Sequence, residues 1–66
     1  MSSSRERIIA GIKPGETLTA LDIQIRLALS AKACQRHIDH LVIHGKLVRI
    51  VGIGRQPARY KLPEHR

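Results

Sequence analysis

The chain has 66 residues, one cysteine, and 12 lysine and arginine residues against 5 acidic ones, which gives a formal net charge of +7. A chain this short buries only about 60% of its unfolded surface, so it forms one domain at most, with a small core and no room for an enclosed catalytic pocket. The lone Cys34 excludes an internal disulfide and a cysteine-rich zinc site, and the charge favours polyanions, nucleic acid before anionic membrane surfaces.

The sequence also lacks the segments and motifs of several protein classes. No apolar run approaches the roughly 20 residues that span a bilayer, and the first apolar run is too short for a signal peptide, so we expect a cytoplasmic, nucleoid-associated protein with no membrane partner. Tyr60 is the only aromatic residue, which disfavours RNA and single-stranded partners that stack bases on aromatic rings. Without a nucleophile elbow, a phosphate-binding loop or a carboxylate pair, we expect no enzyme activity and no cofactor.

The first predicted element is a short helix. Ser3 and Glu6 fit a capping box, in which a hydroxyl and a carboxylate satisfy free backbone N–H groups at a helix start. The isoleucines that follow predict a helix from Ser4 to Gly11 or Ile12. Residues 13–16 contain a Pro-Gly pair and predict a turn.

The second predicted element is a helix with a tight exit. Residues 17–18 favour a brief strand, and Thr19 with Asp22 forms a second capping box. The following residues predict a helix over 20–27. A connection of three residues, 28–30, then leads to the next helix, and this spacing is typical of a helix-turn-helix.

The third predicted helix covers about 31–44. Ser30 is a good N-cap, and Gly45 can take the left-handed conformation that ends a helix. Apolar residues recur at helical spacing and predict one buried face, formed by Cys34, Ile38, Leu41 and Val42.

Two strands with a loop between them follow Gly45. Residues 47–51 are rich in β-branched side chains, and 58–62 alternate small or apolar residues with basic ones. Residues 52–57 hold two glycines, an arginine and a proline. The sequence therefore predicts a hairpin directly after the third helix.

The order of helix, short strand, helix, helix and hairpin resembles the winged helix-turn-helix fold over about 4–62. The segment 27–30 with its continuation to 47–49 looks like the third helix and strand of many bacterial regulators, and 54–60 resembles their basic wing. In size the chain is most similar to small stand-alone fimbrial-operon, phage or plasmid DNA-binding proteins. The resemblance implies an α+β, mainly α, domain over 3–62, with three helices followed by a two-stranded β-hairpin wing. Residues 1–2 and 63–66 are expected to be flexible ends.

The same resemblance implies a sequence-specific regulator that binds double-stranded DNA, with the third helix in the major groove. At about 100° per residue, Lys32, Gln35 and Arg36 lie on a polar arc beside the apolar stripe, near the helix start. Arg can pair with guanine and Gln with adenine, and Ala31 is small enough to approach a thymine methyl. The alternative is an ordinary solvated helix face.

The 52–58 wing is expected to touch the DNA backbone or the minor groove. Its candidate contacts are Arg55 and Gln56, with Arg59 on the second strand. The alternative is a basic hairpin whose charge keeps an edge strand from pairing with another chain.

Two residues depart from the pattern of DNA-binding regulators. Asp39 lies on the arc that would meet phosphates, and Ile43 stands where these proteins usually have a polar residue. Ile43 with Val42 forms a potential apolar spot, which leaves open a homodimer or a protein partner. The alternative function is therefore a protein-interaction module of the same fold, an adaptor or anti-regulator.

Three histidines share the remaining arc of the third helix, namely His37, His40 and His44. Two of them are four residues apart, a spacing that can place two imidazoles on one metal ion, but no cluster elsewhere in the sequence offers further ligands. We expect no metal site, and imidazoles at the edge of the core.

Overall fold

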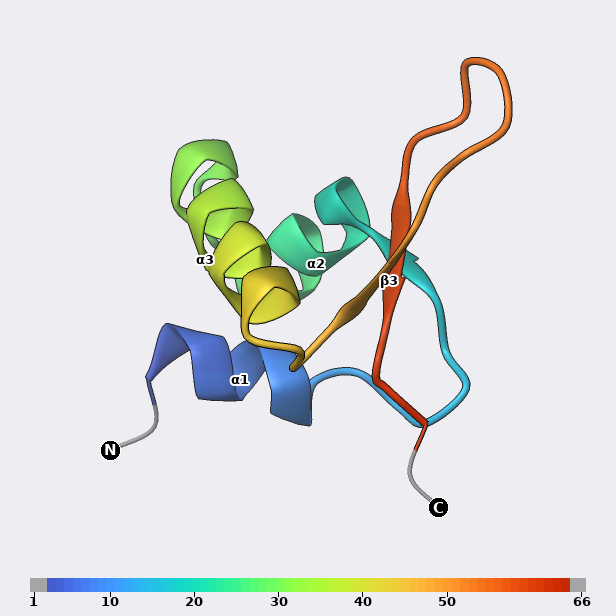
Figure 1. The fold of residues 1–66 in the computed structure, drawn as a ribbon. Helices are drawn as coiled ribbons and strands as arrows, with labels where there is room; N and C mark the ends of the chain where they lie inside the picture. Colours follow the sequence, from blue (N-terminus) through green and yellow to red (C-terminus); the bar gives the residue numbers. More distant parts are fainter. Residues whose placement is uncertain (1–2, 65–66) are drawn as a thin grey trace.

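The computed structural model describes residues 3–64 and is an α+β fold with more helix than strand (Figure 1). Its three helices and three strands follow the order α1 (Ser4–Ala10), β1 (Leu18–Thr19), α2 (Ala20–Leu27), α3 (Ala31–Ile43), β2 (Val48–Ile50) and β3 (Arg59–Lys61). The helix bounds are close to those that the capping signals predict, and those of α2 are the same.

Each helix begins at a hydroxyl side chain that accepts from a free backbone N–H of the first turn. Ser3 and Ser30 each accept from the N–H three residues later at 3.2 Å. At α2 the capping box is complete, because Thr19 and Asp22 exchange two hydrogen bonds of 3.1 Å. These contacts are local, which is why the sequence predicts the helix starts.

The connections that follow α2 and α3 use left-handed backbone. Ala28 has φ +54 and ends α2, so that the chain reverses into Ser30 within three residues, as predicted. After α3 the chain passes His44 and then Gly45, with φ +72, the residue predicted to end this helix. Glycine adopts that φ at little cost because it has no Cβ.

The sheet has three antiparallel strands in the order β1-β3-β2, so the expected two-stranded hairpin is wrong in its strand count. Leu18 pairs with Tyr60 on one side of β3, and Arg49 pairs with Tyr60 on the other. A two-stranded hairpin would leave one edge of β3 with unpaired backbone groups. β1 occupies that edge, and the pairing places Leu18 beside Tyr60 in the core.

The core lies where the three helices meet one face of the sheet. Cys34 is buried in it, and this burial raises the pKa of the thiol, which therefore behaves as a small apolar side chain. All three helices, the loops and the sheet contribute to this core, which consists of Ile8, Ile12, Leu18, Ile23, Cys34, Ile38, Leu41, Leu47 and Tyr60.

A loop over residues 51–58 joins β2 to β3 and is called the hairpin loop below. Figure 1 shows that it projects away from the helices. At its tip the Gln56 N–H donates to the Ile53 carbonyl at 3.2 Å, and Gly54 has φ +63. A glycine with positive φ at the first central position is typical of the type II′ turns that join antiparallel strands.

The end of the described chain carries no helix or strand after Lys61, and Lys61 Nζ lies 3.8 Å from a carboxylate oxygen of Glu64. Of the expected flexible ends, residues 1–2 and 65–66 lie outside the described residues. Between residues 3 and 64, no helix has both the length and the apolar character needed to cross a membrane.

Candidate nucleic-acid interface

The N-terminal half of α3 presents its polar arc to solvent. Lys32, Gln35 and Arg36 are all exposed, whereas Cys34 and Ile38 between and beyond them are buried. A helix packed by one stripe leaves its other arcs in solvent, so the apolar periodicity predicts that these three side chains are exposed. Ala31 is also exposed, in the first turn.

Asp39 is not an isolated acid on this arc. The Gln35 Nε2 donates to Asp39 Oδ1 at 2.8 Å, across one turn of the helix. The bond orients the Gln35 amide and leaves its oxygen and one N–H available to a ligand. It also places a carboxylate within the basic surface, where it lowers the local positive potential.

The cations of the predicted site are available for an outside partner. Lys32, Arg36, Arg55 and Arg59 form no ion pair with any residue in the described range. The two ion pairs found there use other residues, joining Arg26 to Glu16 at 2.7 Å and Lys61 to Glu64 at 3.8 Å. Most of the positive charge is therefore not neutralised within the fold.

The predicted hairpin contacts fall in two places. Arg55 and Gln56 are exposed in the turn at the tip of the hairpin loop. Arg59 is paired with Thr19 and Ile50, next to the inward-facing Tyr60. Since successive residues of a strand point to opposite faces, Arg59 lies on the sheet face that is turned away from the core.

Arg49 is a candidate that the sequence interpretation missed. It pairs with Tyr60 and so lies on the helix-facing side of β2, where it lines a surface hollow of about 260 Å³ together with Asp39, Val42 and Ile43 of α3. The buried Leu47 two residues earlier is the sequence signal that would have placed Arg49 on this side.

The start of α3 and the hairpin loop extend toward the same end of the molecule (Figure 1). The exposed residues of the α3 start and those of the loop therefore lie on two segments at one end of the molecule. A protruding helix and a protruding basic hairpin can contact a long polyanion at two points.

The histidines lie on a different side of α3 from the polar arc, and this side faces α1. Arg5 Nη1 contacts His40 Nε2, and because a guanidinium only donates, the imidazole must accept and be neutral. Burial, followed by the charges of Arg5, His44 and His37, lowers the pKa of His40. The rings of His40 and His44 are 4.2 Å apart. Within residues 3–64, no three metal-ligating side chains are grouped to hold an ion.

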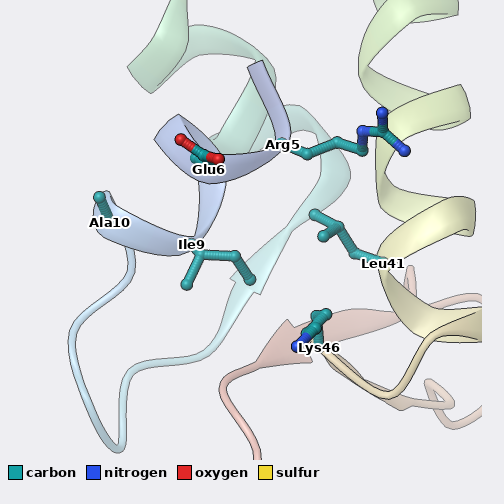
Figure 2. Close-up of a pocket in the computed structure, with 6 residues that line it drawn as sticks. All are labelled: Arg5, Glu6, Ile9, Ala10, Leu41 and Lys46. Atoms are coloured by element: carbon teal, nitrogen blue, oxygen red, sulfur yellow. The ribbon is translucent and has the colours of Figure 1, made fainter. Parts of the chain in front are cut away.

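A second surface hollow, of about 460 Å³, lies between α1 and the end of α3 (Figure 2). Ile9 and Leu41 give it apolar walls, and Arg5 extends past it toward α3 while Lys46 lies on the other side. Leu41 is roughly 14 Å along the helix axis from Lys32 at 1.5 Å per residue, so this hollow is separate from the polar arc.

Comparisons of the chain with models of protein families, with curated proteins and with solved structures found no match.

Proposed function

We propose that the protein binds double-stranded DNA in a sequence-specific manner and regulates transcription, as a domain of the winged helix-turn-helix type. The observation that carries this proposal is the set of unpaired, exposed cations on α3 and the hairpin loop, two projections at one end of a chain with net charge +7. Such clustered positive charge is the electrostatic footprint of nucleic-acid binding.

In this proposal the start of α3 enters the major groove, which is wide enough for a helix. Arg36 would pair with guanine O6 and N7, and Gln35 would use its free amide atoms on adenine. Lys32 would neutralise a phosphate or approach a guanine, and Ala31 would contact a thymine methyl. The Asp39 bond holds Gln35 in place before DNA arrives, which lowers the entropy cost of that contact.

The hairpin loop would contact the duplex beside α3. Arg55 and Gln56 at its tip would reach the backbone or the minor groove. Arg59 would meet a phosphate from the outer face of the sheet, and Arg49 another from the side of α3. A domain of this size covers few base pairs, so useful specificity requires a homodimer or repeated sites.

The test is a fluorescence titration of the purified protein against random-sequence duplex at low and moderate salt, followed by selection of bound sites from a random pool. We expect binding at low salt that weakens steeply as salt rises, because the phosphate contacts release counterions. The selected motif reports base preference and half-site spacing. Absence of duplex binding at low salt would exclude the proposal.

A second candidate, a protein-interaction module with the same fold, is favoured by the end of α3. Ile43 is 80% exposed and, with Val42, lines the hollow beside Asp39 and Arg49. An apolar side chain next to a carboxylate and a guanidinium would suit a protein surface better than phosphates. If this candidate is correct, Ile43→Glu abolishes partner binding or dimerisation, while Arg36→Ala has no effect on either. A monomer whose behaviour Ile43→Glu does not change would rule out this candidate.

A further inference from the structure

The tip of the hairpin loop carries exposed aliphatic side chains that the fold does not use. Ile53 is 85% exposed and Val51 is 76% exposed, and neither belongs to the core or packs against it. Ile50, Val51 and Ile53 line one shallow surface of the hairpin, so the exposed aliphatic groups are small in area but grouped on a projecting basic loop.

The residues beside Ile53 have no side chains. Gly52 must remain glycine for lack of space, since a Cβ there would lie 2.1 Å from the Gln56 carbonyl oxygen. Gly54 has φ +63, a conformation that suits glycine. The loop therefore presents one branched side chain between two bare backbone positions, which makes a narrow apolar point.

The backbone that carries Ile53 is fixed before any partner binds. The Ile53 carbonyl accepts from the Gln56 N–H at 3.2 Å, and Pro57 follows with its restricted φ. A backbone held in this way loses little conformational freedom on binding.

The charges around the point favour a nucleic acid as its partner. Arg55 follows Ile53 by two residues, and Arg59 lines the same shallow surface as Ile53. A contact between two copies through this tip would bring Arg55 and Arg59 of both loops together, so like charges oppose it. An anionic bilayer fits less well, because the two aliphatic side chains give little area and the chain has no Trp or Phe to anchor it.

We propose that Ile53 is a wedge that enters a base step from the minor groove and bends the duplex, with Arg55 held against the adjacent phosphates. The inference rests on the proposed DNA-binding function and adds a mechanism to it. Apolar side chains, isoleucine among them, unstack base steps in this way in minor-groove proteins.

The reach of the hairpin is long enough for insertion, whereas its width limits insertion to places where the groove is widened. Ile53 lies three positions beyond the last paired residue, Ile50, a reach of roughly 10 Å at 3.3 Å per residue, and the minor groove is about 7.5 Å deep. The two chains of a hairpin lie about 4.8 Å apart between backbones, so with their atoms they exceed a groove about 6 Å wide. The tip therefore enters only where the groove opens, and insertion at a base step opens it.

Insertion also predicts that loss of the Ile53 side chain affects DNA bending and DNA affinity differently. Burying the isoleucine side chain is favourable, whereas unstacking the bases is unfavourable, and the two terms oppose each other. Removing the wedge should therefore abolish the bend while changing affinity by less than about tenfold. A merely structural role for Ile53 would reduce both together through loss of the fold.

The experiment uses the full chain and a duplex of about 30 base pairs with a central TA step, which is easily kinked, and dyes at its two ends for energy transfer. A second duplex carries 2-aminopurine at that step to report unstacking. The variants are Ile53→Ser and Ile53→Leu. Ile25→Ser on α2, where the isoleucine is 70% exposed, is the matched control.

We expect the parent, Ile53→Leu and Ile25→Ser to bend the duplex by some 20–90° and to raise 2-aminopurine emission, and Ile53→Ser to bind without either effect. A parent complex with straight DNA, or an Ile53→Ser complex that bends it equally, would overturn the wedge and leave the proposed DNA binding intact. If the parent protein binds no duplex, both the wedge and the proposed DNA binding are excluded. Loss of binding to anionic phosphatidylserine vesicles in Ile53→Ser, with no duplex binding by the parent, would assign the tip to membranes instead.

Discussion

The side-chain amide of Gln35 donates to Asp39 Oδ1 at 2.8 Å, so the acidic residue of the α3 polar arc orients the amide beside it. Asp39 therefore has two separable effects on a DNA complex. Its charge repels phosphates, and its oxygen fixes Gln35 for contact with a base.

Two substitutions at Asp39 separate these effects. Asp39→Asn keeps an oxygen that accepts from Gln35 but removes the charge, so we expect tighter binding to all duplexes with base discrimination retained. Asp39→Ala removes both, so we expect tighter binding with discrimination weakened by about 1–3 kcal/mol at one position. Titrations against the selected site and a single-base variant measure this difference. Equal base discrimination in the two variants would show that the Gln35–Asp39 hydrogen bond does not contribute to base recognition.

Arg36 and Arg55 are expected to contribute in different ways. Arg36→Ala should reduce discrimination by about 1–3 kcal/mol at one base pair, because a bidentate contact is lost. Arg55→Ala should weaken binding to all sequences alike and lower the slope of log affinity against log salt by about one, since one phosphate contact is lost. Salt titrations on matched and mismatched duplexes give both quantities. The reverse pattern would exchange the assigned roles of α3 and the hairpin loop.

The hairpin loop depends on two glycines for different reasons. Gly52→Ala places a Cβ 2.1 Å from the Gln56 oxygen, so the chain must shift, and we expect a loss of about 1–3 kcal/mol in the free energy of unfolding. A Cβ added at Gly54 meets no atom within 4 Å, and asparagine tolerates φ +63, so we expect a smaller loss from Gly54→Asn. Urea unfolding, with hydrogen exchange at the Gln56 amide, compares the two. Equal stability would contradict the close backbone approach at Gly52.

The partial burial of His40, together with the nearby charge of Arg5, predicts a pH dependence of stability. The pKa of His40 in the folded protein is below its ordinary value, so between the two values the unfolded chain binds more protons and stability falls with falling pH. The contribution is complete above about pH 6.5 and is lost as the pH drops below it. Unfolding between pH 5 and 8 measures it, where Glu16 and Asp22, whose pKa values are lowered, stay ionised.

His40→Gln provides the control for this pH dependence. The glutamine oxygen can still accept from Arg5, but it does not titrate, so the decline in stability below about pH 6.5 should become shallower. A pH profile unchanged in this variant would assign the decline to other groups.

Local signals in the sequence account for the helices. Hydroxyl caps, the Thr19–Asp22 box and the left-handed Gly45 each depend on residues within four positions of one another, and the 3.6-residue period of Cys34, Ile38 and Leu41 depends on one helix. Such contacts form in the same way whatever the rest of the chain does. They were therefore enough to predict α2, α3 and the exposed polar arc.

Contacts between distant residues could be decided only by the tertiary structure. The pairing of Leu18 with Tyr60, the placing of Arg49 beside α3 and the contact of Arg5 with His40 join positions far apart in the chain, which no local pattern specifies. The sequence alone determined a helical frame with a basic face and a glycine-rich hairpin. Packing decided the third strand of the sheet and the surroundings of Arg49 and His40, because each depends on which backbones and side chains come close in space.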